Sequence, residues 1–288
     1  MRVIINRQAL LAIPELIKWK LSAAVAFSSM TGYILCAGNA DSGLLFVVAG
    51  VFLLASGSAA LNQFTERKTD ALMDRTMKRP LPSGKMKATS AVIIAAVLLL
   101  SGSMLLAING PAPLFLGVLN VIVYNGIYTG LKKITTLAIL PGALVGAVPP
   151  LIGYTAAGGA VTDTGILLFA LFMFLWQLPH FWILLVKYGH EYEKAGIKTI
   201  YDTMTDRQIG RLVFLWILAS SLLLWILTSI LMPFKTSAGL LLLGLNITFI
   251  VLFYRALFRY GREKGLKNAF ILINSFSLLV MIILIALS

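Results

Sequence analysis

The chain has 288 residues, of which 59% are hydrophobic and 12% are charged, and its formal net charge is +13. Soluble proteins carry about 25% charged residues, so this composition excludes an ordinary soluble domain and predicts a protein of the lipid bilayer. Cys36 is the single cysteine, which excludes an intrachain disulfide framework and a thiol metal site.

Nine segments contain no Asp, Glu, Lys or Arg, and each is close to the roughly 17–25 apolar residues that cross a bilayer as a helix. They are 21–40, 43–65, 88–108, 113–131, 137–157, 164–186, 212–232, 237–254 and 268–287. None shows the alternation that membrane β-strands have over about ten residues. The sequence therefore predicts an all-α, multi-pass membrane protein that forms one domain over residues 1–288, with nine transmembrane helices.

Basic residues gather in alternate connections. Of the 24 Lys and Arg residues, 23 lie in the first 20 residues and the even-numbered loops, and Lys235 alone lies in the opposite set. The positive-inside rule then predicts a cell (inner) membrane protein with a cytoplasmic N-terminus and an external C-terminus. This bias accounts for the net charge without a nucleic-acid partner. Nine of the 11 acidic residues share the basic side, which the rule does not require and which indicates chemistry there.

A polar stripe follows the second span. Asn62, Glu66, Asp70 and Asp74 recur every four residues, and residues 62–78 contain neither Gly nor Pro, so we expect a helix with these side chains on one face. Carboxylates at the edge of a membrane helix are costly to desolvate and indicate a functional site. Oxygen ligands beside cationic side chains suit Mg²⁺ and a phosphorylated substrate. The alternative is a solvated helix with salt bridges to its own basic residues.

Two further features lie in the middle of the chain. After the fourth span, Tyr128 is followed by Lys132, which either anchors the helix end or neutralises phosphate charge. The fifth span is rich in helix-disturbing residues, namely Pro141, Gly142, Gly146, Pro149, Pro150 and Gly153. This composition predicts a kinked helix beside a chamber, or close packing of two helices through small residues.

The sixth span and the loop after it carry the remaining candidates. Trp176 and His180 lie inside the span, where a histidine is either a hydrogen-bonded structural residue or a contact for a substrate. Lys187, Glu191 and Tyr192 follow the span on the same side as the stripe. They form an ordinary juxtamembrane charge patch, or they join the stripe in holding metal ions that bridge a diphosphate.

These motifs resemble those of the UbiA superfamily of intramembrane prenyltransferases and, within it, the haem O synthase (protohaem IX farnesyltransferase) branch. The branch pattern N-x-x-x-[DE]-x-x-x-D followed by M-x-R-T-x-x-R-P-L is matched by Asn62, Glu66, Asp70, Met73, Arg75, Thr76, Arg79, Pro80 and Leu81. Its W-Q-x-P-H is matched by Trp176, Gln177, Pro179 and His180, and its D-Y-x-x-A-G, with Glu for Asp, by Glu191, Tyr192, Ala195 and Gly196. The resemblance covers about residues 15–200. It departs from the family's T-K-P-R at Ile17-Lys18-Trp19-Lys20.

The resemblance implies a UbiA-type bundle with a central cavity open to the cytoplasmic side. It implies an enzyme that transfers farnesyl from farnesyl diphosphate to a vinyl group of haem B, giving haem O, with Mg²⁺ as cofactor and a haem A synthase as a candidate partner. The implied catalytic residues are Asn62, Glu66, Asp70, Lys132 and Glu191, and the implied metal ligands are Glu66, Asp70, Asp74 and Glu191. The implied substrate contacts are Arg75, Arg79, Lys187, Tyr128, Tyr192, Trp176 and His180.

Two rival functions stay open at this point. One is a UbiA-type prenyltransferase that acts on a quinone precursor or another aromatic acceptor. The other is a membrane transporter that uses the disturbed fifth helix and His180 as its pathway. The carboxylates favour the enzyme, because they lie at the membrane edge or in loops and not at the midplane.

Overall fold

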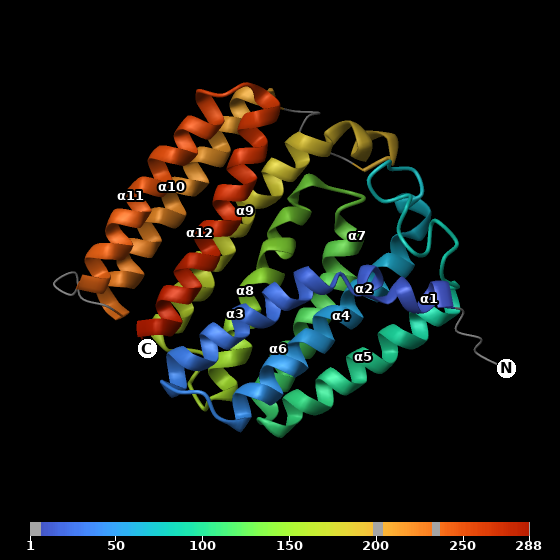
Figure 1. Ribbon diagram of the computed structural model, residues 1–288, viewed down its shortest axis with the longest axis horizontal. Coiled ribbons are helices and arrows are strands. Elements are labelled where there is room, and N and C mark those ends of the chain that lie inside the picture. Colours follow the sequence, from blue (N-terminus) through green and yellow to red (C-terminus); the bar gives the residue numbers. More distant parts are fainter. Residues whose placement is uncertain (1–6, 198–203, 232–236, 288) are drawn as a thin grey trace.

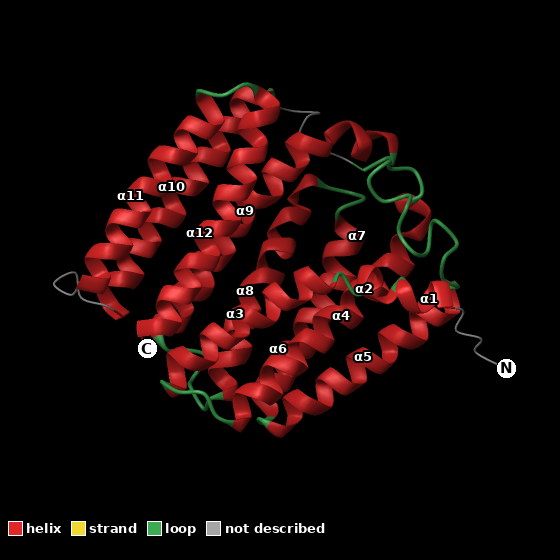
Figure 2. Cartoon of the chain, viewed as in Figure 1, coloured by secondary structure: helices red, strands yellow, loops and turns green. Residues whose placement is uncertain are grey.

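The computed structural model describes residues 7–197, 204–231 and 237–287, and within these ranges every regular element is a helix (Figure 2). In chain order they are α1 (Arg7–Leu11), α2 (Ile13–Leu16), α3 (Trp19–Ala37), α4 (Ser42–Asp70), α5 (Ala88–Ile108), α6 (Pro111–Ile122), the π-helix η1 (Val123–Tyr128), α7 (Thr129–Leu131), the 3-10 helix η2 (Thr136–Ala138), α8 (Ile139–Ala156), α9 (Thr164–Lys194), α10 (Asp206–Leu231), α11 (Ser237–Phe258) and α12 (Arg262–Leu287).

Over the described ranges, nine helical segments are long and apolar enough to cross a membrane. They coincide with the nine predicted spans, so the all-α, multi-pass fold class is confirmed. The fourth span is built from α6, η1 and α7, and the fifth from η2 and α8. Two spans, α4 and α9, extend beyond their predicted ends toward the charged loops.

The spans form a bundle in which neighbours in sequence pack side by side (Figure 1). Helix α8 touches α3, α4, α6 and α9, while α12 packs on both α9 and α3 and so joins the last spans to the first. One hydrophobic core lies among α9 to α12, and a second lies among α3 to α6 and α8. This arrangement leaves the polar residues of α4, η1 and α9 around a common space.

Small residues bring the backbones of α3 and α8 close together at two places. A side chain at Gly153 of α8 would meet the carbonyl oxygen of Ser29 in α3, and one at Gly32 would meet that of Pro150. Packing of this kind lets membrane helices gain dispersion energy where lipid supplies no hydrophobic drive. The close packing predicted for the fifth span is confirmed; α8 runs as one helix through its internal prolines, and the kink stays a prediction.

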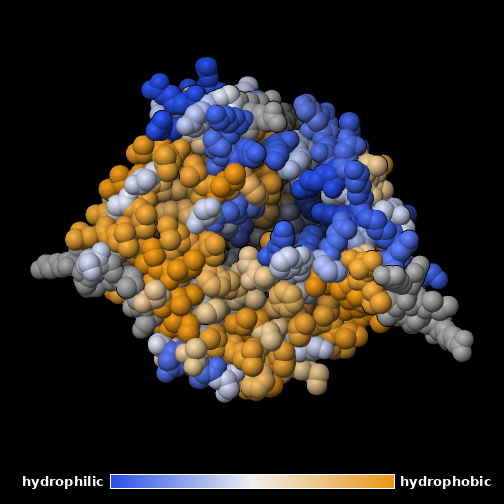
Figure 3. Space-filling model, viewed as in Figure 1, coloured by the Kyte–Doolittle hydropathy of each residue, from blue (hydrophilic) through white to orange (hydrophobic). Residues whose placement is uncertain are grey.

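Polar groups fix the connection between α3 and α4. Asp41 caps α4 by accepting from the backbone N–H groups of Gly43 and Leu44, at 2.9 and 3.3 Å. The hydroxyl of Tyr33 donates to the same carboxylate at 2.5 Å, and together these donors hold the pKa of Asp41 below its usual range. Hydrophilic residues gather on this face of the molecule along the upper and right-hand edges of Figure 3.

Candidate active site

A cavity of about 410 Å³ lies between α3, α4, α6, η1, α8 and α9. Its polar walls include Lys18, Asn62, Glu66, Asp70, Arg75, Arg79, Asn120, Tyr124, Tyr128, Lys132, Gln177, His180 and Tyr192, and its apolar walls include Val25, Val51, Leu54, Gly117, Val121 and Ile152. A hollow bordered by hydrophilic residues opens near the same loops in Figure 3. The cavity therefore joins a charged mouth to an apolar interior, as the predicted site requires.

Two ion pairs stand at the charged mouth. Arg79 Nη1 donates to both carboxylate oxygens of Asp70, at 3.0 and 2.8 Å, and Lys132 Nζ pairs with Glu66. The carboxylates are 2% and 6% exposed and each cation is 20% exposed. Because the acids are almost fully buried, each depends on its cation for compensation. The geometry unites four residues that the sequence placed in the site.

The predicted helix through residue 78 is wrong, because α4 ends at Asp70. The chain then turns back over the cavity: Thr76 Oγ1 donates to the carbonyl oxygen of Asp70 at 2.8 Å. Met73 and Thr76 are buried by this turn, whereas a continued helix would have left them beyond the bundle. Asp74 thus leaves the stripe, is exposed and does not line the cavity.

The π-helix η1 sets the side of the cavity opposite α4. Thr129 Oγ1 donates to the carbonyl oxygen of Tyr124, five residues back, and accepts from Asn62 Nδ2 at 3.2 Å. The rings of Tyr124 and Tyr128 stack at 5.6 Å, and Lys132 Nζ lies 5.4 Å from the centre of the Tyr128 ring. π-helical turns are rare and concentrate at functional sites. Here the wide turn presents both tyrosines and Lys132 to the cavity.

The C-terminal end of α9 closes on the loop after α4. The backbone of α9 departs from helical geometry at Tyr188, and beyond it Glu191 accepts from the backbone N–H of Arg75 at 2.9 Å. The Arg75 guanidinium donates to the Tyr192 hydroxyl at 2.9 Å and lies 4.6 Å from the Tyr188 ring centre. Arg75 and Tyr192 line the cavity; Glu191 holds the loop and does not line it.

Two predicted substrate contacts lie away from the cavity. Lys187 is exposed, with its Nζ 5.2 Å from the centre of the Tyr188 ring. Trp176 belongs to the core, where its Nε1 donates to the carbonyl oxygen of Ile273 in α12 at 2.8 Å. His180, one turn further on, does line the cavity, and its ring stacks on that of Trp176 at 5.4 Å.

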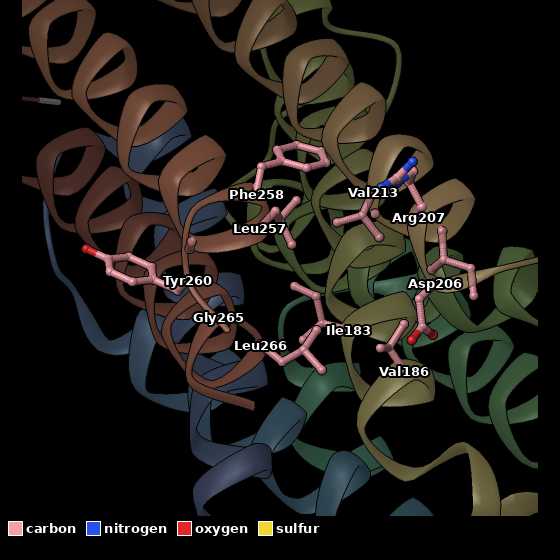
Figure 4. Close-up of a pocket in the computed structure, with 13 residues that line it drawn as sticks. Ile183, Val186, Asp206, Arg207, Val213, Leu257, Phe258, Tyr260, Gly265 and Leu266 are labelled. Carbon is pink, nitrogen blue, oxygen red and sulfur yellow. The ribbon is translucent and has the colours of Figure 1, made fainter. Parts of the chain in front are cut away.

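A second pocket of about 310 Å³ lies between α9, α10, α11 and the start of α12 (Figure 4). Its labelled walls are mostly apolar, with Asp206 and Arg207 together at one side. Among its described lining residues Asp206 is the single acid, so this pocket lacks the paired carboxylates of the first cavity. The chemistry-bearing side chains therefore favour the cavity between α4, η1 and α9.

Comparison with known proteins agrees with this geometry. Residues 25–281 match the model of the UbiA prenyltransferase family. The chain belongs to the UbiA prenyltransferase family.

Relatives and solved structures support this placement at different levels. The chain is 41% identical over 178 residues to a protoheme IX farnesyltransferase of Geobacter sulfurreducens, covering 62% of this chain and 66% of the relative. It is 40% identical over 190 residues to a protein of the same name from Cytophaga hutchinsonii, covering 65% and 66%. A UbiA homologue from Archaeoglobus fulgidus bound to DMAPP and Mg²⁺ shares the fold, with a TM-score of 0.73, 13% identity and coverage of 96% and 98%. The alignments thus span just under two thirds of these relatives' length.

The acidic residues of this UbiA member fit a hard cation at one place. Glu66 Oε1 is buried, and among the described residues its one polar neighbour is Lys132, with which it forms an ion pair. Magnesium is commonly held by one or two carboxylates together with substrate phosphates, which Glu66 and Asp70 can supply. Over the described ranges, no three acidic, histidine or cysteine side chains gather as a metal site, so the larger predicted ligand set is not assembled.

Sequence reasoning did not assign Lys18 to the site of this UbiA member. Lys18 lines the cavity in the left-handed region, with φ 47°, between α2 and α3. Gln63 of α4 fixes this bend by donating to the carbonyl oxygens of Glu15 and Leu16, both at 2.9 Å. Burial and the neighbouring Arg79 and Lys132 lower the pKa of Lys18 to about 7. One sequence signal could have identified Lys18: it stands where the family's T-K-P-R motif has its lysine, although Ile17, Trp19 and Lys20 differ from that motif.

Proposed function

We propose that this chain transfers a farnesyl group from farnesyl diphosphate to a vinyl group of haem B and so forms haem O. The observation that carries the proposal is a mouth of paired carboxylates and cations above an apolar cavity, in a chain about two fifths identical to two protoheme IX farnesyltransferases. The charged mouth suits the diphosphate, and the apolar cavity suits the isoprenoid tail. In the membrane we expect the charged loops on the cytoplasmic side, where soluble diphosphates are available.

Binding of the donor is assigned to the residues of the mouth. Lys18, Arg79 and Lys132 line it and present cationic donors to a diphosphate. Glu66 and Asp70 would hold Mg²⁺ on the diphosphate oxygens, where the ion supplies charge stabilisation for the leaving group. The side chains of Lys132 and Arg79, now on these carboxylates, can turn to the diphosphate when it binds. Once the donor is bound, the departing negative charge is met by these cations, which lowers the barrier to cleavage of the allylic C–O bond.

The walls below the mouth protect and direct the allylic cation. The faces of Tyr124 and Tyr128 offer the electron-rich surfaces that attract a cation, with the apolar residues beyond them receiving the tail. The π electrons of the haem vinyl group form the new C–C bond, and the positive charge moves to the vinyl carbon next to the pyrrole. Addition of water there gives the hydroxyethylfarnesyl group of haem O. No covalent intermediate with the protein is required.

The test is haem analysis of membranes from a host without its own haem O synthase. We expect the wild-type chain to convert haem B into a heavier haem whose mass corresponds to hydroxyethylfarnesyl addition, and Asp70→Asn at equal membrane abundance to give haem B only. Chelation of divalent cations should stop product formation and pyrophosphate release, and added Mg²⁺ should restore both. Haem B alone from abundant, folded wild-type chain would refute the haem assignment.

The same membranes separate the rival functions. Pyrophosphate release that depends on an aromatic quinone precursor, and not on haem, would favour the other acceptor class of the family. Movement of a labelled solute without any pyrophosphate release would favour a transporter. The two buried ion pairs at the mouth favour chemistry on a diphosphate, which both prenyltransferase functions share, over transport of a solute.

A further inference from the structure

Below the charged mouth, one face of α9 carries polar groups. These groups have no role in the proposed bond cleavage or in the formation of the C–C bond. Gln177, His180, Phe181 and Leu184 all line the cavity. Their spacing of three and four residues puts them on a single helical face. Two of these four side chains, Gln177 and His180, are polar inside a membrane span, where polar groups are costly unless they are satisfied or functional.

Neither polar side chain is satisfied by the protein. Across the described ranges, no hydrogen bond is formed by the Gln177 amide or by either ring nitrogen of His180. Nδ1 of His180 is fully buried, whereas Nε2 retains accessible surface. The imidazole is held by its ring contacts, at 5.4 Å from Trp176, 5.1 Å from Phe270 and 5.9 Å from Phe181. The ring is thus held by three aromatic side chains, and in the described ranges its Nε2 and the Gln177 amide are both without a protein partner.

These groups lie just below the place where the allylic carbon must lie. The Tyr128 ring stands 5.4 Å from Lys132 Nζ at the mouth and 6.2 Å from the Phe181 ring, which adjoins His180. Helix α8 gives the same order of depth: a side chain at Gly142 would meet Tyr128, and one at Gly146, a turn further in, would meet the Gln177 amide. The free polar groups therefore follow the aromatic layer directly.

We propose that Gln177 and His180 hold the water molecule that adds to the cationic vinyl carbon, and that His180 Nε2 receives its proton. This inference rests on the proposed function. The Gln177 amide orients the water, the water oxygen forms the C–O bond, and one O–H bond of the resulting oxonium breaks as its proton passes to the imidazole. The imidazolium returns the proton to solvent when the product leaves, so the step is balanced by one water molecule and no further reactant.

Other titratable groups of the cavity are less suited to this step. Glu66 and Asp70 are engaged by Lys132 and Arg79, and the tyrosine hydroxyls are weak proton acceptors. Lys18, whose pKa is lowered to about 7, lies at the mouth among these ion pairs and not on the face of α9. A protonated water bound to carbon is a strong acid, so a neutral imidazole is sufficient as its acceptor. A cation that is not captured by water must instead lose a proton from a neighbouring carbon, which gives a farnesylated haem lighter than haem O by one water.

The product ratio tests the inference. We expect His180→Phe and Gln177→Leu to raise the ratio of dehydrated to hydroxylated farnesyl haem by at least roughly tenfold, because a positioned proton-transfer partner contributes about 10²–10⁴-fold to a rate. His180→Gln, which keeps a polar group, should restore part of the hydroxylated product. Leu171→Ala, on an exposed part of α9, is the matched control and should leave the ratio unchanged. In ¹⁸O-labelled water the wild-type hydroxyl should carry the label.

The outcomes separate this inference from the proposed function. If the wild-type chain forms no farnesylated haem, the proposed function fails. If it forms haem O, and both variants lower the yield with an unchanged ratio, the two residues act in haem binding or folding and the water site is overturned. Extraction of all samples in parallel shows whether dehydration arises during work-up, because that would affect the wild type equally.

Discussion

Arg79→Met tests how far the Arg79–Asp70 ion pair stabilises the fold, as distinct from its part in the reaction. The change removes both hydrogen bonds to Asp70 and leaves a carboxylate that is 2% exposed without its cation. Asp70 is also the last residue of α4, where the helix dipole disfavours negative charge. We expect the free energy of unfolding to fall by about 3–5 kcal/mol, the cost of an uncompensated buried charge.

The expected loss can be measured as a thermal shift in detergent. For chains of roughly 150–250 residues each kcal/mol moves Tm by about 2–4 °C, so the shift should be on the order of 10 °C. Asp70→Asn removes the charge and keeps one acceptor for Arg79, so its cost should be smaller, about 1.5–3 kcal/mol, which is the value of one hydrogen bond to a charged group. That variant should still lose prenyl transfer by about 10²-fold or more, because the metal-binding charge is gone.

The double variant Asp70→Asn/Arg79→Met completes the comparison. Without a buried charge it should be more stable than Arg79→Met alone while remaining inactive. Lys78→Met, an exposed neighbour in the same loop, is the matched control and should leave Tm and activity unchanged. Wild-type stability in Arg79→Met, or wild-type activity in Asp70→Asn, would refute the reasoning about the charged mouth.

Three further predictions concern other parts of the molecule. The pKa of Lys18 in the free protein is lowered to about 7, and a bound diphosphate would raise this pKa. Affinity for the donor should therefore be highest below pH 7 and fall as the pH rises from 7 through the pKa of Lys18 in the complex. In a competition assay, Lys18→Met should bind the donor weakly and its affinity should depend less on pH. Gly153→Leu should lower Tm in detergent by driving a side chain into the Ser29 carbonyl, with a cost of about 1–3 kcal/mol, while Gly244→Ala, which has open space, should not. A reporter after Lys85 should be cytoplasmic and one after Ser288 external; the reverse would contradict the proposed access of cytosolic diphosphate.

The bundle follows directly from the sequence because each span is a run of apolar residues whose length matches the bilayer. The pairing of Glu66 and Asp70 with Lys132 and Arg79 does not, because it joins α4 to residues nine and 66 positions away. The spacing of Asn62, Glu66 and Asp70 is sufficient to predict one face of the site, since all three lie within α4.

The error at Asp74 has a tertiary cause. Local propensity favours a helix where no Gly or Pro occurs, but the turn that buries Met73 and returns Arg79 to Asp70 overrides it. The position of Lys18 also depends on contacts that no local pattern contains, namely those of Gln63 with the end of α2. Trp176 shows the opposite error: it belongs to a motif that carries a cavity residue, but its own side chain packs in the core.

The wide turn of η1 absorbs one residue without disturbing the side chains that follow it. A π-helical turn accommodates one residue more than an α-helical turn, and here it comes directly before the segment that ends at Lys132. Deleting a single residue from Val123–Tyr128 would therefore let the span run as an ordinary α-helix, and Lys132 would still face Glu66. The deletion would instead remove the wide turn itself, in which Thr129 Oγ1 reaches the carbonyl oxygen of Tyr124 five residues back and accepts from Asn62. In this segment one extra residue shapes the wall of the cavity while the register of the charged mouth is kept.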